Sequence, residues 1–312
     1  MSVATGARTY RRGYTPPAHL RGLVAAAHRT NPVLTFAAAG ACHLLLVFSL
    51  LGPAWTLAIA GPVPGVLAGL AGLAGYARAM RGLECLVHEG SHFNWVRRTR
   101  WLNDLLTVTL AGLPSGLRLS AYRSAHLVHH GRFGTWEDPE WRRYQELNLA
   151  ALPRHSPLAL LRGVYRRLFW YQRTVTPASW AAVAGPSFCG LALTAVSGLS
   201  WGPAAAVLSS AVWLAGFLLV LPAVRLAGEA SEHSYTGTAT LFAATWSNLG
   251  PWHRLLVHPH GDGHHALHHL WPGVPHHRLP GLHRALLAAD PGGYGRELRY
   301  RTRMLTGPAP LP

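Results

Sequence analysis

Nine of the chain's twenty histidines fall into four short clusters whose spacing suits metal binding. The clusters are HEGSH with His88 and His92, HLVHH with His126, His129 and His130, EASEH with His233, and HALHH with His265, His268 and His269. Residues three or four apart share one face of a helix, so a cluster can aim its rings at a single point. Imidazole binds zinc, copper, iron and nickel, and one ion accepts at most about six ligands in octahedral geometry. Nine convergent histidines therefore predict two metal ions.

The elements that position these clusters are predicted from where charge is missing. Residues 30–77 and 174–224 contain no Asp, Glu, Lys or Arg. Each interval is long enough for two helices of about 20 residues and a turn, and a bilayer core requires helices of that length. We expect Gly52 and Pro53 to break the first interval, with its second helix at 55–76, and residues 200–203 to break the second. A soluble protein is disfavoured, because its helices would normally carry a charged outer stripe.

These patterns predict an all-α integral membrane protein. Four transmembrane helices form two hairpins, and a cytoplasmic helical cap carries the histidine clusters. We treat residues 1–312 as a single domain, divided into a cytoplasmic N-terminal segment (1–32), a first hairpin (33–76), a cytoplasmic or interfacial segment (77–177), a second hairpin (178–227) and a cytoplasmic tail (228–312). Every arginine lies outside the charge-free intervals, so the positive-inside rule puts both termini and all four clusters in the cytoplasm. The expected location is the plasma membrane.

The formal net charge of +16 comes from 28 basic residues, all of them arginine. We attribute it to contact with an anionic membrane surface and not to nucleic-acid binding. Residues 157–171 mix Arg with Leu, Phe and Trp, which predicts a helix lying in the membrane interface. Residues 104–117 are apolar but too short to span, so they are expected to be interfacial or re-entrant. The three cysteines predict no disulfide framework.

Acidic residues are scarce in this chain, yet seven of the 12 lie within eight positions of a cluster histidine. They are Glu84, Glu89, Glu137, Asp138, Glu229, Glu232 and Asp262. Metal-bound imidazole usually donates its second ring N–H to a carboxylate or carbonyl, so we expect this group to orient the ligands. For a single residue such as Asp138, shaping the turn before Pro139 is an equally good interpretation. Glu229 lies one turn before His233, where it can reach a metal directly or through water.

The other histidines lack paired spacing. Those of the C-terminal region are expected on the surface or behind the ligands; they are His253, His258, His260, His264, His276, His277 and His283. His43, inside the first span, is expected to be packed and hydrogen-bonded, although histidines within membranes are often functional.

The clusters HEGSH, HLVHH and HALHH resemble the histidine boxes HxxxH, HxxHH and HxxHH of the membrane fatty acid desaturase family. The flanking segments WLNDLL, GRFGTWEDPEW and HHALHHLWPGVPHHRLP are similar to the family's flanks, and EASEH resembles its additional ligand site. The resemblance covers roughly residues 35 to 285. It implies a non-haem di-iron centre that activates O2, with the nine histidines as its ligands and catalytic residues. Two features depart from the pattern: Leu267 stands where many relatives carry an acid, and Glu229 replaces an amide of the stearoyl-CoA branch.

The resemblance further implies an enzyme that desaturates an acyl chain carried on acyl-CoA, acyl carrier protein or a lipid. Since no haem domain is fused to the chain, electrons would come from a separate ferredoxin or cytochrome with its reductase. A hydroxylase or ketolase that acts on a lipid, a carotenoid or a specialised metabolite is the alternative, because desaturation and hydroxylation share the first hydrogen abstraction. A metal transporter or storage protein is a third hypothesis, but transporters usually hold their ligands near the bilayer midplane.

Overall fold

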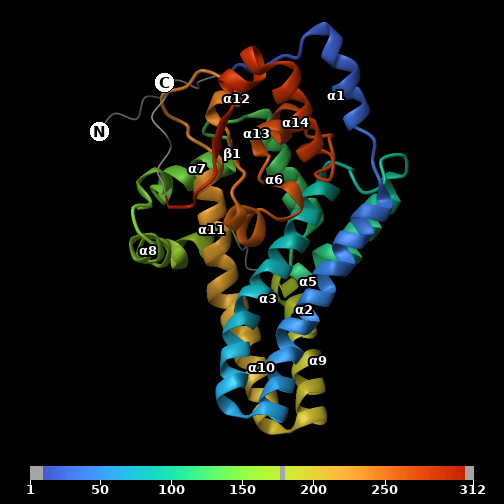
Figure 1. Cartoon of the computed structure of the whole chain (residues 1–312), viewed down its shortest axis with the longest axis vertical. Coiled ribbons are helices and arrows are strands. Elements are labelled where there is room, and N and C mark those ends of the chain that lie inside the picture. The colour runs from blue at the N-terminus through green and yellow to red at the C-terminus, as the bar shows by residue number, and fades with distance from the viewer. Residues whose placement is uncertain (1–9, 176–179, 306–312) are drawn as a thin grey trace.

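Four long apolar helices form one end of the molecule, and shorter helices form a cap at the other end (Figure 1). The computed structural model describes residues 10–175 and 180–305. The long helices are α2 (Pro32–Ala60), α3 (Pro62–Ser91), α9 (Trp180–Trp201) and α10 (Pro203–Ala215), which continues through a π-helical turn (Gly216–Val220) into α11 (Leu221–Glu232). The shorter helices are α1 (Arg21–Ala27), α4 (Arg100–Thr107), α5 (Leu113–Ser115), α6 (Leu119–Gly131), α7 (Pro139–Glu146), α8 (Pro157–Val175), α12 (Leu241–Ala244), α13 (His265–Leu270) and α14 (Leu279–Ala289).

Four segments of the described chain are long and apolar enough to cross a membrane: Pro32–Ala60, Pro62–Ser91, Ala182–Trp201 and Pro203–Glu232. The number agrees with the four spans that the charge-free intervals predict. α2 is joined to α3 by the single residue Gly61, and α9 is joined to α10 by Gly202. The two helices of each pair pack against each other. Both glycines adopt positive φ, of 88° and 89°, and a proline begins the next helix with its φ already helical.

The predicted turn at Gly52 and Pro53 is wrong, because α2 continues through both residues to Ala60. Proline inside a helix removes one N–H and leaves the carbonyl four residues earlier without its helical donor. That carbonyl belongs to Ser49, and it faces Gly72 of α3 so closely that a Cβ on Gly72 would lie 2.6 Å from the oxygen. The proline is tolerated because the neighbouring helix covers the gap at a residue without a side chain.

The second membrane helix extends beyond Tyr76, where the sequence predicts its end. α3 runs on to Ser91 and therefore carries the first histidine cluster itself. The charged residues Arg81 and Glu84 in this extension do not end the helix, because they are paired inside the protein. Glu84 of α3 forms ion pairs with Arg81 one turn earlier and with Arg225 of α11.

The cap contains one element that the all-α prediction lacks, a two-stranded parallel sheet of β1 (Trp246–Asn248) and β2 (Arg299–Arg301). The sheet ties the C-terminal segment to the region after α11. The predicted interfacial segment 104–117 folds as α4, a π-helical turn (Val108–Gly112) and α5, and it packs on α3 and α9. His43 is within hydrogen-bonding distance of the Leu110 carbonyl of this segment, at 2.8 Å, as expected for a packed histidine.

The exposed face of α8 bears on how the chain meets a membrane. α8 exposes large apolar side chains along one face, among them Leu158, Leu161, Phe169 and Trp170. The arginines of the same helix include Arg166 and Arg173. The exposed face of α8 therefore mixes arginine with Leu, Phe and Trp side chains, the mixture from which an interfacial helix is predicted. All three cysteines are free thiols.

Candidate metal centre

Four elements far apart in the sequence bring the nine cluster histidines together within the cap (Figure 1). His88 and the adjoining His92 come from the end of α3, and α6 supplies His126, His129 and His130. α13 supplies His265, His268 and His269, and His233 directly follows α11 in an extended conformation bridged to Thr245. Seven of the nine rings are buried, and His92 and His130 are partly buried. The helical spacing predicted from the sequence is therefore the spacing that makes the rings converge.

The rings form two groups in which the ligand atoms all lie within 4.8 Å of one another. One group holds five histidines, namely His88, His92, His126, His130 and His268, and the other holds four, namely His129, His233, His265 and His269. In the five-membered group, Nε2 of His268 lies 2.8 Å from Nε2 of His88 and 3.0 Å from that of His130. In the four-membered group, Nε2 of His265 lies 3.0 Å from that of His233 and 3.2 Å from that of His269.

These distances fit metal binding better than hydrogen bonding among the rings. A neutral imidazole nitrogen has either one hydrogen or one lone pair. Nε2 of His268 therefore cannot form a full hydrogen bond with the Nε2 atoms of both neighbouring rings. An ion that binds each nitrogen at about 2.1 Å would place adjacent ligands about 3.0 Å apart if they met at right angles. The observed Nε2 separations of 2.8 to 3.2 Å match that value. Two metal ions therefore fit the two groups.

Burial also keeps most of these rings in the form that binds metals. Together with the neighbouring rings, it lowers the pKa of His126, His130, His233, His265, His268 and His269 well below the usual range. Neutral imidazole is the ligand form. His129 differs: burial opposes its charge, but the carboxylates of Glu140 and Asp138 outweigh burial and raise its pKa to about 9. A metal ion bound at Nε2 would displace that proton and take its place beside the carboxylates.

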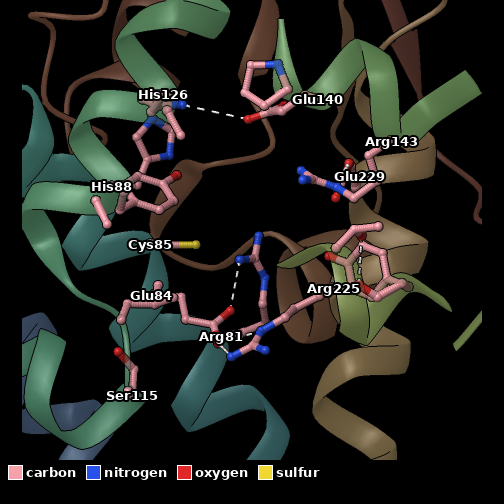
Figure 2. Close-up of a pocket in the computed structure, with 18 of the residues that line it drawn as sticks. Arg81, Glu84, Cys85, His88, Ser115, His126, Glu140, Arg143, Arg225 and Glu229 are labelled. Atoms are coloured by element: carbon pink, nitrogen blue, oxygen red, sulfur yellow. Dashed lines mark hydrogen bonds and ion pairs between the residues drawn. The ribbon is translucent and has the colours of Figure 1, made fainter. Parts of the chain in front are cut away.

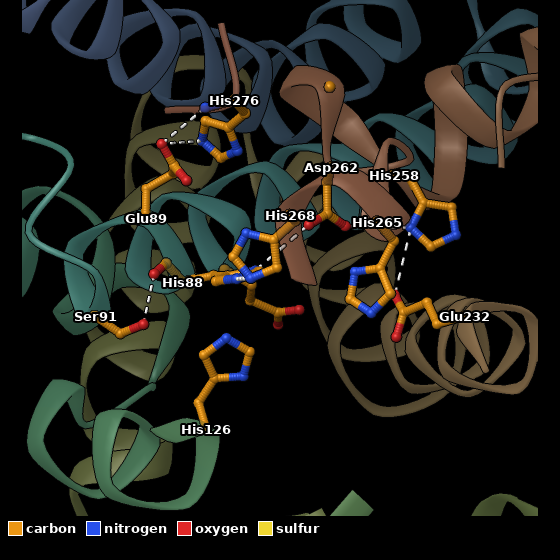
Figure 3. A network of polar contacts seen from close by, with 12 residues as sticks. His88, Glu89, Ser91, His126, Glu232, His258, Asp262, His265, His268 and His276 are labelled. Carbon is orange, nitrogen blue, oxygen red and sulfur yellow. Dashed lines mark hydrogen bonds and ion pairs between the residues drawn. The ribbon is translucent and has the colours of Figure 1, made fainter. Parts of the chain in front are cut away.

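Three acids contact the rings, and two of them, Asp138 and Asp262, do so at Nδ1 on the outer side. Asp138 Oδ1 lies 3.0 Å from Nδ1 of His129, and the same oxygen accepts the N–H groups of Glu140 and Trp141 at the start of α7. Asp138 therefore holds the ring and caps a helix at once. Asp262 Oδ1 lies 3.4 Å from Nδ1 of His88, and its other oxygen lies 3.2 Å from Nδ1 of His258 (Figure 3). Glu140, the third acid, reaches two rings.

Glu140 is the residue that sequence reasoning missed. Its Oε2 lies 3.4 Å from Nε2 of His129, the atom that faces the other ligands, and its Oε1 lies 3.8 Å from Nδ1 of His126. An acid in the first turn of a helix is fully explained by the helix dipole, so its position after Pro139 concealed it. The signal that was present is the flank GRFGTWEDPEW of the second cluster, which contains Glu140.

Glu229, the sequence candidate for an additional metal contact, lies outside both histidine groups. Its Oε1 accepts a hydrogen bond of 2.5 Å from Nε of Arg143 on α7. The other acids of the predicted set have partners of their own: Glu84 pairs with Arg225, Glu89 with His276, Glu137 with Arg132, and Glu232 with His258. Of the seven acids, Asp138 and Asp262 contact a cluster histidine.

The prediction places the seven C-terminal histidines on the surface or behind the ligands. None of the seven is exposed, so the surface alternative is wrong. His253, His258, His264, His276 and His283 are buried, and His260 and His277 are partly buried. His258, Glu232 and Asp262 form a third, smaller group with ligand atoms within 4.8 Å of one another. This group lies directly behind His88, since Asp262 belongs to it and contacts that ring.

The described part of the fold has four helices long and apolar enough to cross a membrane, and the site gathers nine histidines into two groups at metal-ligand spacing. The sequence model of the family described as fatty acid desaturase matches residues 58–302, which include all nine histidines. The chain therefore belongs to the fatty acid desaturase family. Among curated proteins, no sequence matches this chain.

Proposed function

We propose that this protein is a membrane-bound, O2-dependent di-iron oxidoreductase that oxidises an unactivated C–H bond of its substrate. The single observation that carries the proposal is the convergence of nine Nε2 atoms into groups of five and four at ligand spacing. Family membership supports iron as the metal. Two bound iron ions would supply the reduction of O2 and the oxidation of the C–H bond.

The chain's own residues have three tasks in this reaction. The nine histidines hold both ions, and burial within the cap keeps most of them neutral. Asp138 and Asp262 fix the orientation of His129 and His88 through their Nδ1 atoms. The cavity beside His88, His126 and His265 places one carbon of the substrate near the centre.

Two overall reactions satisfy this description, and both need electrons that the chain does not supply. Desaturation converts a CH2–CH2 unit to CH=CH, and the two hydrogens removed from it combine with one O2, two electrons and two protons to give two waters. Hydroxylation replaces one hydrogen by OH with the same inputs and releases one water. Acyl desaturation is the reaction that family membership favours. Oxidation of a more polar metabolite is the second candidate, and the charged lining of the cavity favours it.

We further propose the surroundings in which the protein works. α2 with α3 and α9 with α10 would form two transmembrane hairpins in the plasma membrane, with both termini and the cap in the cytoplasm. α8 would rest on membrane lipid. Electrons would reach the centre from a ferredoxin or a cytochrome with its reductase. If the substrate is an acyl chain, it would arrive on acyl-CoA, acyl carrier protein or a lipid.

The test is an untargeted mass-spectral comparison of cells that express the wild-type chain or its His268→Ala variant, combined with iron analysis of both purified proteins. We expect about two irons per wild-type chain and a product that requires O2 and is absent with the variant. A loss of two hydrogens would identify a desaturase, and a gain of one oxygen a hydroxylase. Wild-type protein that folds and binds no iron would refute the proposal, and uptake of metal ions into vesicles would favour a transporter.

A further inference from the structure

A cavity of about 620 Å³ opens beside the metal centre, between α3, α6, α7, α8 and α11 (Figure 2). Its wall includes His88 and His126 of the five-histidine group and His265 of the four-histidine group. A molecule in this cavity would therefore touch ligands of both metal sites. The volume lies within the range of about 300 to 1,000 Å³ that is common for small-molecule sites.

Ten of the 25 described residues that line this cavity are charged, a large share for a site that would hold a hydrocarbon. Five arginines and five acidic residues contribute to it. The larger apolar or aromatic side chains of the lining are Leu117, Tyr122, Tyr171 and Phe217, and it also includes small residues such as Ala121 and Ala125. Apolar side chains normally predominate in the pockets of small-molecule sites, so this lining needs an explanation.

One wall is a row of ion pairs that runs from α11 across α3 to a metal-ligand histidine. Arg225 donates to Glu84 Oε1 from Nε at 2.6 Å, and Arg81 Nη1 lies 3.2 Å from Glu84 Oε2. Arg81 also lies 3.5 Å from Asp262, which contacts His88. Glu84 is only 3% exposed, so the pair is held within the protein and closes this side of the cavity.

The opposite wall carries a guanidinium with donors to spare. Arg143 uses Nε for its 2.5 Å hydrogen bond to Glu229, and its guanidinium carbon lies 6.0 Å from the centre of the Tyr171 ring. Figure 2 shows the guanidinium of Arg143 reaching from α7 toward the open middle of the cavity. Its two terminal nitrogens can therefore present the planar fork that binds a carboxylate or phosphate through two parallel hydrogen bonds. Two exposed arginines, Arg118 and Arg173, also line the cavity.

A long hydrocarbon chain is poorly matched to these walls. Charged groups that face methylenes lose water and gain no hydrogen bond, which is costly even when the charges are paired. A polar substrate would replace that water with its own hydrogen bonds, and a site built for such bonds strongly rejects an analogue that lacks them.

We propose that the substrate oxidised at this centre is a compact polar molecule with an anionic group bound by Arg143, and not a long acyl chain. The inference rests on the proposed function, because it assumes that the reacting carbon lies in this cavity. It assigns Arg143 and its partner Glu229 to substrate binding, and it assigns Glu84 and Arg225 to the closed wall.

The first test asks in which fraction of the cell the product appears. Water-soluble and lipid extracts of cells with the wild-type chain or His268→Ala are compared by mass spectrometry, and iron-loaded protein in lipid nanodiscs is offered palmitoyl-CoA with a chemical reductant. A wild-type-only product in the water-soluble extract supports the inference. A double bond or hydroxyl group found in palmitoyl-CoA or in membrane acyl chains overturns it.

A second test does not depend on turnover. The melting temperature of the iron-loaded protein in nanodiscs is measured with succinate, a compact dianion, and with dodecanoyl-CoA. We expect succinate to raise it in the wild type and to have no effect in the double variant Arg143→Leu/Glu229→Leu, which replaces the pair with apolar side chains. The matched control Arg132→Leu/Glu137→Leu removes an exposed ion pair outside the cavity and should respond as the wild type does. No response to succinate, or a response to dodecanoyl-CoA that survives the loss of Arg143, contradicts the inference.

The failures are distinguishable. Iron-loaded protein that oxidises an acyl chain would leave the proposed function intact and overturn the inference alone. Protein that folds without iron would refute the proposed function itself. For the true substrate, Arg143→Leu/Glu229→Leu should lower kcat/KM by at least about tenfold, the factor that corresponds to about 1.4 kcal/mol, while iron content stays unchanged.

Discussion

The histidine centre and the charged wall next to it are both buried and polar, but they are satisfied in opposite ways. In the wall, each charge has an opposite charge within reach, as in the contacts of Glu84 with Arg225 and Arg81. In the centre, like atoms face like atoms, and Nε2 of His268 meets two other Nε2 atoms at 2.8 and 3.0 Å. A network of paired opposite charges stabilises the fold by itself, whereas like ligand atoms that converge on one point are arranged to bind a cation there.

The same contrast separates the atoms on the two sides of each ring. Nδ1 of His129 has a carboxylate partner in Asp138, and Nδ1 of His88 has one in Asp262. Among the described residues, Nδ1 of His265 and of His269 is buried without a hydrogen-bond partner, and Nδ1 of His126 has only the Glu140 carboxylate at 3.8 Å. The protein therefore orients some ligands firmly and leaves others to be fixed by the metal. This division predicts that removing an Nε2 atom will reduce metal binding more than removing the carboxylate partner of an Nδ1 atom.

The largest effect is expected from removing a ring that stands between two others. His268→Ala deletes the nitrogen that faces both His88 and His130, so the five-histidine group should lose its ion and activity should fall by more than about a thousandfold. Iron content and product formation measure this. His155→Ala, which removes an exposed histidine, is the control and should leave both unchanged. Full activity of His268→Ala would show that this group is not the metal site.

A substitution in the charged wall should lower the free energy of unfolding more than it lowers the metal content. Glu84→Gln leaves Arg225 and Arg81 without their shared carboxylate, and we expect the free energy of unfolding to fall by roughly 3 kcal/mol. Thermal unfolding in detergent measures the change, with Glu137→Gln as an exposed control that should cost about 0 to 1 kcal/mol. If both variants lost the same small amount, the wall would not be a buried ionic network.

A smaller effect on metal affinity is expected from the residues behind the rings. Asp138→Asn retains a side-chain oxygen for the start of α7 but weakens the contact with Nδ1 of His129, so iron affinity should fall about 10- to 100-fold with little change in helix stability. Asp290→Asn is the matched control and should leave iron affinity unchanged. The side chain of Asp290 also accepts backbone N–H groups at the start of a turn. Equal iron affinity in wild type and Asp138→Asn would mean that the carboxylate only caps the helix.

The sequence could predict the histidine centre because its signals are local. Spacings of three and four residues on a helix already specify which rings share a face, and the two charge-free intervals indicate where the clusters emerge. The charged wall could not be predicted in the same way, since Glu84 and Arg225 lie 141 positions apart and only packing brings them together. Glu140 escaped for a different reason: a helix-terminal acid has an ordinary explanation, and only the fold shows the rings that it faces.

The turn of the first helix pair shows where local reasoning fails. Gly and Pro in sequence are the strongest single signals for a break, and both Gly52–Pro53 and Gly61–Pro62 have them. The structure uses the second pair, because α3 covers the carbonyl that Pro53 leaves without a donor. Backbone conformation separates the two glycines: Gly52 is helical, and Gly61 has φ of 88° and ψ of −176°.

That difference gives the smallest and most specific prediction. A residue with a side chain rarely adopts the conformation of Gly61, so Gly61→Ala should lower the free energy of unfolding by about 1 to 3 kcal/mol, although nothing lies within 4 Å of the added Cβ. Gly52→Ala also meets nothing within 4 Å, but its helical backbone suits alanine, and we expect no loss or a slight gain in stability. Thermal unfolding of the two variants side by side measures the difference. The reverse order would mean that the chain turns at Gly52 and Pro53 after all, and that Gly72 does not cover a continuous α2.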